Sequence, residues 1–412
     1  MFRLWKLAIR DLGRNKRRSA LTLVAVGLGL ALLIVTSGFT EGSIQGAIEN
    51  NIRVRSGHVQ MREESYDEDK VGLKWDDLLD DPQGLAAQAQ ALPEVRAATP
   101  VLWASGILAT SEESAGVQVS GIDPLAETST PFREGLVAGE FLAADDRTGI
   151  LIGERLARSL GLTAGDDISL LVNTSDEQPD EAIFTIRGLY DTGTPSYDEI
   201  TVFMALAKAQ AFTRAGDRAS AVVVLLHDKE DADAVAGALR APGPMAQEVR
   251  TFTWRDLNQV ILQAVEMSMG IMYLMYLVVL AVVAVVIANT LLMSVFERTR
   301  EMGILAALGM KGRQVLAMFV LEAGILGVIG IAAGLLLGSL GVYYLATQGW
   351  HIGELANMAT AEVAYGETIY AQFAPAEMVQ LSIASLVITL LASLYPAWFA
   401  ARMEPIDALR AL

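Results

Sequence analysis

The stretch MSMGIMYLMYLVVLAVVAVVIANTLLMSVF, residues 267–296, decides the fold class because it contains no charged side chain. About 20 residues of helix cross the ~30 Å of hydrocarbon in a bilayer. Three further apolar stretches are long enough to cross, at residues 19–38, 315–345 and 378–399. The sequence therefore predicts an α+β membrane protein with four transmembrane helices and a large external α+β domain between the first two.

The apolar pattern divides the chain into segments with different expected environments. In chain order these are a cytoplasmic amphipathic segment (1–18), a first span (19–40), an external domain (41–253) with a strand-rich subdomain inserted at about 117–200, a stalk and second span (254–296), a cytoplasmic segment (297–313), a third span (314–345), an external loop (346–377), a fourth span (378–399) and a cytoplasmic tail (400–412). After Trp254 the helical spacing of apolar residues runs into the second span. This predicts one continuous helix from Trp254 to Glu297, whose outer part forms the stalk.

Charge sets the expected orientation. Lys and Arg gather before the first span and between the second and third spans, whereas residues 346–377 contain neither. Short loops rich in Lys and Arg stay cytoplasmic. We therefore expect an inner-membrane protein with both termini in the cytoplasm and its large domain periplasmic or extracellular.

The net charge of −17 comes from the external region, where residues 41–266 carry 18 basic and 38 acidic side chains. An acidic domain of this kind argues against nucleic acid as a partner. The favoured interpretation of this charge is a solubilising surface.

Motifs for catalysis are missing from the sequence. Gly-Lys never occurs, which excludes a Walker A phosphate loop on this chain, and there is no cysteine. The histidines His58, His227 and His351 lie far apart in sequence and are expected to be solvated or packed rather than metal ligands. We therefore expect no catalytic residue, no metal and no cofactor on this chain, and no enzymatic activity of its own.

Two apolar patterns repeat within the external domain. Each is a strand, a helix and a strand, read at 58–61, 83–92 and 95–102 in the first and at 221–226, 231–240 and 248–254 in the second. Two βαβ-type halves meeting would form one α+β subdomain. Chance resemblance of two such units is the alternative.

The spans also carry small and polar residues suited to helix packing. Gly330, Gly334 and Gly338 recur every four residues, which lets another helix approach closely, either within the chain or from a second copy. Asn289 lies within the second span, where an interhelical hydrogen bond is expected. Glu322 lies within the third span and is interpreted as a packed or water-reached carboxylate.

Three segments together resemble one protein family. The most specific is ERTREMG, residues 297–303, within a similar stretch at 289–309, and the others lie at 8–22 and 395–410. They resemble the FtsX/MacB-type permeases of ABC transporters, the mechanotransmission or type VII class. Residues 56–59, 121–124 and 152–161 resemble its lipoprotein-releasing, Lol-type branch.

The resemblance implies a function across the membrane. In that family the loop between spans two and three docks on a cytoplasmic ATPase, which here implies coupling residues Glu297, Arg298, Arg300, Glu301, Met302, Gly303, Leu308 and Gly309. MacB proteins carry the ATPase before span one, where this chain has only 18 residues. The resemblance therefore implies a separate ATPase subunit that binds ATP and Mg, and a second permease, identical or not.

The Lol-type resemblance also implies a lipoprotein or other amphipathic substrate, held in a cavity between two permeases in contact with membrane lipids. Candidate cavity residues are Phe39, Met269, Met272 and Tyr273, since methionine is flexible enough to fit variable acyl chains. Ordinary lipid-facing or core packing is the competing interpretation of these residues. The functional alternatives are a MacB-like exporter of peptides or drugs and an FtsX-like regulator of cell-wall hydrolases.

Overall fold

The computed structural model describes residues 16–66, 73–240, 249–351 and 368–402. The chain divides into two compact units, each with apolar clusters of its own. The helical unit comprises Met1–Ile44, Val265–Trp350 and Ile369–Leu412. The soluble unit comprises Gln45–Ala264 and His351–Thr368.

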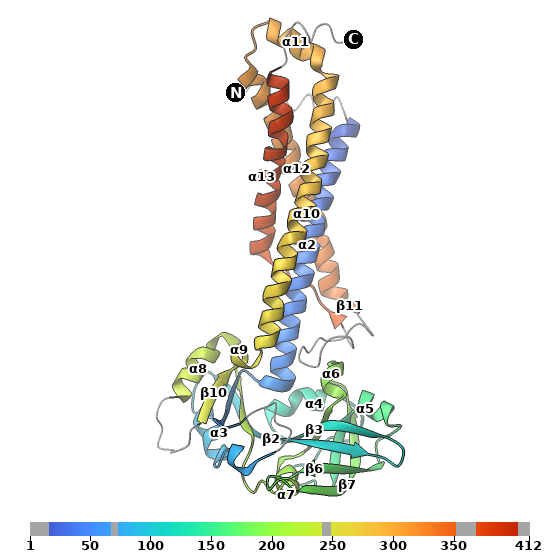
Figure 1. The fold of residues 1–412 in the computed structure, drawn as a ribbon, viewed down its shortest axis with the longest axis vertical. Coiled ribbons are helices and arrows are strands. Elements are labelled where there is room, and N and C mark those ends of the chain that lie inside the picture. Colours follow the sequence, from blue (N-terminus) through green and yellow to red (C-terminus); the bar gives the residue numbers. More distant parts are fainter. Residues whose placement is uncertain (1–15, 67–72, 241–248, 352–367, 403–412) are drawn as a thin grey trace. The chain divides into compact units, whose positions relative to one another are not determined.

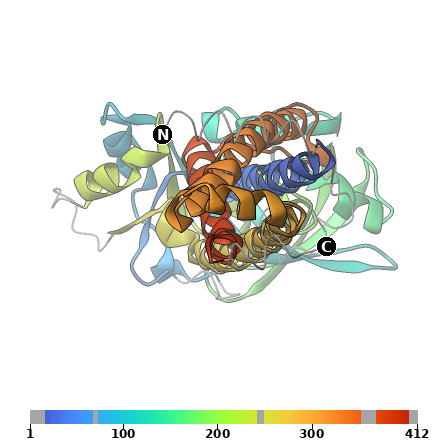
Figure 2. The ribbon, with the colours of Figure 1, turned by 90° about the horizontal axis from the view of Figure 1, so that it is seen from above.

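Four long helices run through the helical unit and gather side by side in Figures 1 and 2. They are α2 (Lys16–Asn51), α10 (Gln259–Glu297), α12 (Gly312–Gln348) and α13 (Pro375–Ala401), and the short α11 (Thr299–Ala307) lies between α10 and α12 in the chain. All four long helices are long and apolar enough to cross a membrane, as the hydropathy predicted.

The first span and the predicted stalk differ from the sequence prediction. Helix α2 continues to Asn51, beyond the expected end of the span at residue 40, because helical backbone bonding does not require the apolar side chains that mark a span. The prediction of a single helix from Trp254 to Glu297 is wrong, since Asn258 separates α9 (Trp254–Leu257) from α10. The side-chain amide of Asn258 donates to the Trp254 carbonyl at 2.6 Å, and such local bonds compete with the helical backbone pattern.

Strands and short helices alternate through the soluble unit. The strands are β1 (Val59–Glu63), β2 (Val95–Ala109), β3 (Ser114–Ile122), β4 (Leu136–Gly139), β5 (Gly149–Gly153), β6 (Asp167–Asn173), β7 (Pro179–Tyr190), β8 (Thr201–Ala205), β9 (Ala221–Leu226) and β10 (Val249–Thr253). The α-helices are α3 (Pro82–Gln90), α4 (Thr130–Glu134), α5 (Glu154–Ser159), α6 (Pro195–Asp198), α7 (Leu206–Phe212) and α8 (Ala232–Leu239). Single turns of other helical types are η1 (Ile52–Ser56), η2 (Trp75–Asp77), η3 (Glu127–Ser129) and η4 (Lys229–Asp231), and β11 (Trp350–His351) pairs with β12 (Thr368–Ile369).

The strands join into one sheet of ten in the order β10-β1-β9-β2-β3-β8-β5-β7-β4, with β6 pairing β2 and β7. The strands and helices expected in the two repeats are present, but the two strands of each repeat do not pair with each other. Strand β1 lies between β9 and β10, and β9 lies between β1 and β2, all antiparallel. The two units therefore interleave, as in a split βαβ arrangement.

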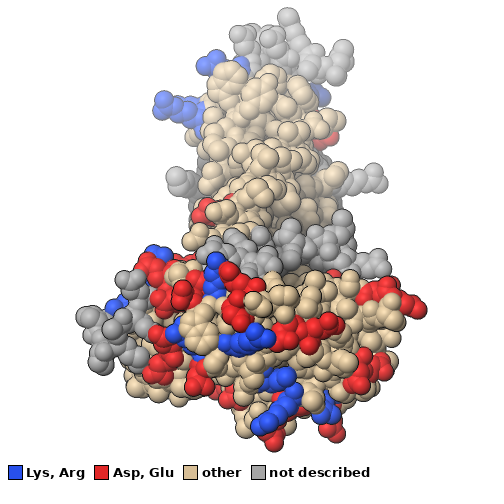
Figure 3. Space-filling view, turned by 60° about the horizontal axis from the view of Figure 1, so that its bottom comes forward, with Lys and Arg blue, Asp and Glu red and all other residues tan. Residues whose placement is uncertain are grey.

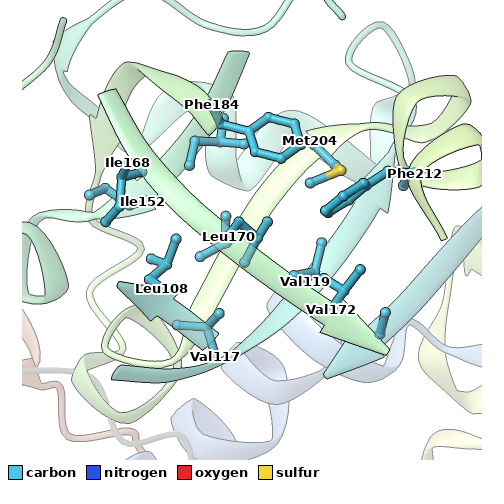
Figure 4. Close-up of a cluster of buried hydrophobic side chains, with 14 of the residues drawn as sticks. Leu108, Val117, Val119, Ile152, Ile168, Leu170, Val172, Phe184, Met204 and Phe212 are labelled. Carbon is cyan, nitrogen blue, oxygen red and sulfur yellow. The ribbon is translucent and has the colours of Figure 1, made fainter. Parts of the chain in front are cut away.

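Strand β2 is long enough to pair with different strands along its two halves. Its first half pairs with β9 and its second half, from Leu102, pairs with β3. The strands beyond Leu102 enclose a large apolar cluster, drawn in Figure 4, in which Leu108, Ile152 and Leu170 are fully buried. The α+β fold class with four candidate spans is therefore confirmed.

Candidate functional site

The coupling segment predicted between spans two and three folds as the end of α10, helix α11 and the turn before α12. The structure divides the predicted coupling residues into two sets. Exposed side chains are those of Glu297, Arg300, Glu301 and Leu308, and Gly309 is exposed in the turn with φ +95°. The buried set is Arg298, Met302 and Gly303.

The buried face of the segment packs against the ends of the long helices. Met302 of α11 joins Val295 of α10, Phe319 of α12 and Ala397 of α13 in one buried cluster. Burial of this apolar surface holds α11 in place, while its other face presents charged side chains to the surroundings. Such a face suits ion pairing with a protein partner.

Arg298 and Glu322 form an ion pair inside the helical unit. The distance from Arg298 Nη1 to Glu322 Oε2 is 3.6 Å, and the side chains are 4% and 0% exposed. From the sequence, Arg298 is predicted to dock on the ATPase and Glu322 to be a packed carboxylate, and the pairing of the two is not predicted. The available signal was one acidic residue in span three and a basic residue at the end of span two, but no spacing rule links two helices.

The glycines of α12 lie against α2 of the same chain. A Cβ atom built on Gly330 would come within 2.8 Å of Val26 Cβ, and one on Gly338 within 2.9 Å of Ile34 Cβ. A Cβ on Gly334 would lie 2.8 Å from the carbonyl oxygen of Gly27. The stripe therefore allows close approach of two helices within one chain.

Asn289 is exposed on α10. The interhelical hydrogen bond expected for it therefore stays a prediction, and its position on the surface makes a second polypeptide the place to look for the partner.

The predicted cavity residues have two different environments in the helical unit. Met272 packs on the cluster that contains Leu33 and Tyr276, and the Tyr276 hydroxyl lies 3.9 Å from its Sδ. Met269 and Tyr273 are 39% and 65% exposed. Phe39 contacts Trp350, with 5.5 Å between ring centroids.

The same end of α2 makes polar contacts that the sequence pattern does not predict. The buried Ser37 hydroxyl donates a hydrogen bond to the Glu377 carboxylate of α13. The backbone N–H of Gln372 donates to the Gly38 carbonyl at 2.9 Å. A Cβ on Gly42 would collide with the Tyr370 carbonyl oxygen. Small residues at Gly38 and Gly42 therefore let the chain before α13 lie against α2.

Within the soluble unit, hydrogen bonds join the ends of the two long helices. The side chains of Asn51, at the end of α2, and Asn258, just before α10, are bonded to each other and buried. Arg53 of η1 donates to the Thr192 carbonyl at 2.8 Å. The helix ends are thus tied both to each other and to the loop before α6.

Asp198 organises that loop. It accepts hydrogen bonds from the Thr192 N–H at 2.9 Å and from the Thr192 hydroxyl at 2.7 Å. Burial raises the pKa of Asp198 to about 7, although the bonds from Thr192 act in the opposite direction.

His58 of the same unit is partly buried and hydrogen-bonded, as expected for a packed histidine. His58 Nδ1 accepts a hydrogen bond from the Leu226 N–H at 3.1 Å, and burial, followed by nearby Arg96, lowers the pKa of His58 to about 4. Across the described part of the chain, no cluster of three His, Cys, Asp or Glu side chains is arranged to hold a metal ion. Figure 3 shows Asp and Glu spread among Lys and Arg over the visible face of the soluble unit, as on a solvated surface.

Two family models match this chain. The MacB-like periplasmic core domain matches residues 19–241, more than half of the chain, and the FtsX-like permease C-terminal domain matches residues 273–405. The chain belongs to the FtsX/MacB-type permease family. The family that the ERTREMG segment predicted is thereby confirmed.

Relatives of this FtsX/MacB-type permease match it over nearly its whole length. The lipoprotein-releasing system transmembrane protein LolC of Neisseria meningitidis serogroup B is 24% identical over 98% of this chain and 97% of its own length. LolE of Haemophilus influenzae is 23% identical over 94% and 92% of the two chains. The macrolide export ATP-binding/permease protein MacB of Nitrobacter winogradskyi is 23% identical over 98% of this chain, but over 59% of its own length.

Among solved structures, the periplasmic region of MacB from Actinobacillus actinomycetemcomitans is similar to 52% of this chain, at 15% identity and a TM-score of 0.34. The family assignment rests on the sequence models. It makes this FtsX/MacB-type chain a multi-pass membrane permease of an ABC transporter with a periplasmic-type core domain.

Proposed function

We propose that this permease couples ATP hydrolysis by a separate cytoplasmic ATPase to movement of its external domain, and thereby releases lipoproteins from the outer face of the inner membrane. The observation that carries the proposal is the two-faced coupling segment. Glu297, Arg300 and Glu301 are exposed, while Met302 of the same segment is buried against the long helices. A partner that grips the charged face can therefore move the helices behind it.

The extent of the relatives supports a separate ATPase. The chain matches 97% of a LolC protein, but only 59% of a MacB protein whose name includes ATP binding. We propose a complex of two permeases with two ATPase subunits, in which the partners bind ATP and Mg. Both termini and the coupling segment face the cytoplasm, as the distribution of Lys and Arg indicates.

The external site of action is supported by the composition of the spans. Charged side chains deep in a membrane mark pathways for ions and polar solutes. The segment 267–296 contains none, and Glu322 within the third span is paired with Arg298. We therefore expect no polar solute to pass through the bundle. Helix α2 continues into the soluble unit, where Asn51 is bonded to Asn258 just before α10 and Arg53 is bonded to the Thr192 carbonyl. These bonds suit transmission of helix movement within that unit.

The coupling face is tested by Glu301→Lys in the complex with the ATPase. Reversing an exposed charge at a partner interface is expected to lower ATP-dependent lipoprotein release by about tenfold, because like charges then face each other. The measurement is release of a labelled triacylated lipoprotein from proteoliposomes, with ATP turnover followed in parallel. The matched control is Glu266→Lys, an exposed carboxylate on α10 outside the segment. ATPase binding and release that are indifferent to Glu301→Lys would contradict the docking role.

The match to MacB over nearly the whole chain keeps export of a peptide or drug as a second candidate. Photo-crosslinkers at Met269 and Tyr273, which are exposed on α10, distinguish the two. Capture of lipid-anchored protein supports lipoprotein release, and capture of a soluble peptide or drug supports export. Capture of a cell-wall hydrolase by the external domain, with lipoproteins unaffected by depletion of the permease, would instead indicate a regulator.

A further inference from the structure

Arg298 is the one predicted coupling residue among the described residues whose charge faces inward. It lies between α10 and α11, and its guanidinium is 3.6 Å from the Glu322 carboxylate of α12. With a side chain only 4% exposed, Arg298 is not available to an external protein surface. The ERTREMG segment therefore combines exposed charged side chains with one charged side chain that is buried.

The surroundings of the pair are apolar. Val295 and Met302, one turn before and after Arg298, belong to the same buried cluster as Phe319, which lies one turn before Glu322. Charges interact more strongly where water is excluded, and removal of one partner leaves the other charge buried without compensation. The pair therefore has a strong preference for staying together.

We propose that Arg298 and Glu322 are positioning residues that fix α11 on α12, so that a force on the exposed coupling face moves α12 instead of bending the α10–α11 junction. The inference rests on the proposed coupling function. Apolar contacts are non-directional and tolerate sliding of one helix on another. An ion pair between two defined residues sets a register, a role for which buried polar groups are best attested.

The first test measures α11 on the full-length permease alone, in lipid nanodiscs. The chain contains no cysteine, so Ile304→Cys on α11 and Val328→Cys on α12, both exposed, can carry spin labels. We expect one narrow distance distribution in this background and a broadened or shifted one in Arg298→Gln/Glu322→Gln. The double variant removes both charges of this pair together, so neither is left buried opposite a neutral partner, and the fold is expected to persist. A narrow, unshifted distribution in the double variant overturns the proposal.

The second test measures coupling in the complex with the ATPase. In the double variant we expect ATP turnover to remain and release of a labelled triacylated lipoprotein per ATP to fall about tenfold. Arg298→Lys retains the charge and is expected to restore most of both the narrow distribution and the release, and Glu266→Gln is the matched exposed control. Wild-type release by the double variant, or parallel loss of ATP turnover and release, overturns a positioning role. If the unmodified complex releases no lipoprotein, the proposed function fails, while the distance measurement still decides the pair.

Discussion

At the scale of single residues, Gly334 shows how closely two membrane helices approach. We predict that Gly334→Ala destabilises the permease by about 1–3 kcal/mol, because the new Cβ would lie 2.8 Å from the Gly27 carbonyl oxygen and 2.9 Å from Leu30 Cβ. Gly270 on α10 is the matched control, since a Cβ there meets nothing within 4 Å. Gly270→Ala should be neutral or stabilising by about 0.4–1 kcal/mol. Thermal unfolding in detergent measures both, and equal midpoints would contradict the predicted close contact.

Asp198 gives the soluble unit a pH dependence. Burial raises its pKa to about 7, above the ~3.9 of an unfolded chain. Between about pH 4 and pH 7 the carboxyl is therefore protonated in the folded state and ionised in the unfolded state. Stability contributed by this group is therefore complete below about pH 4 and is lost as the pH rises to about 7. We predict that wild type loses about 1.4 kcal/mol per pH unit relative to Asp198→Asn across this window.

The measurement is urea unfolding of both proteins from pH 5 to pH 8, taken as a difference. His58 acts with the opposite sign, because its lowered pKa costs stability as the pH falls from about 6.5 to about 4. Its contribution is common to both proteins and cancels. A difference that does not change with pH would show that Asp198 is ionised normally in the folded protein.

At the scale of elements, α10 is the most exposed of the four long helices. In its apolar 18-residue stretch only 17% is buried, against 44% in the corresponding stretch of α12. Its exposed side chains include Val282, Val285, Asn289 and Met293. An amide exposed among apolar residues is costly in hydrocarbon unless it finds a hydrogen-bonding partner. This face of α10 is therefore the place where we expect the second permease.

We predict that Asn289→Leu weakens association of two permeases by about 0.6–2 kcal/mol, through loss of an interhelical hydrogen bond. The measurement is energy transfer between labelled permeases diluted in lipid, and Asn289→Gln, which keeps an amide, serves as the control. Unchanged or tighter association of the Leu variant would show that Asn289 faces lipid.

At the scale of the whole molecule, the distribution of Lys and Arg predicts one topology. We expect a cysteine at Asp145 in the soluble unit to react with a membrane-impermeant maleimide in intact spheroplasts. A cysteine at Arg313, just inside α12, should react only after permeabilisation, because loops rich in Lys and Arg remain inside. Both positions are exposed, and the absence of native cysteine removes background labelling. Labelling of Arg313→Cys in intact cells would reverse the orientation.

The sequence alone was sufficient for the spans and the family. Uncharged stretches such as residues 267–296 can be stable only in an apolar environment, so their position follows from local composition. The strands of the two repeats also follow from local pattern, and the strand expected at 221–226 is β9, Ala221–Leu226. The ERTREMG segment identified the family because it is specific in itself.

Only the tertiary structure decided which of these local elements meet. The interleaving of β1 between β9 and β10 depends on strands far apart in the chain, and local periodicity contains no information about their order. The break at Asn258 arises because its side chain bonds to the Trp254 carbonyl and to Asn51, a contact between distant segments. Likewise, the inward charge of Arg298 is set by Glu322 on another helix, since burial and pairing are properties of the packed fold and not of a residue's neighbours in sequence.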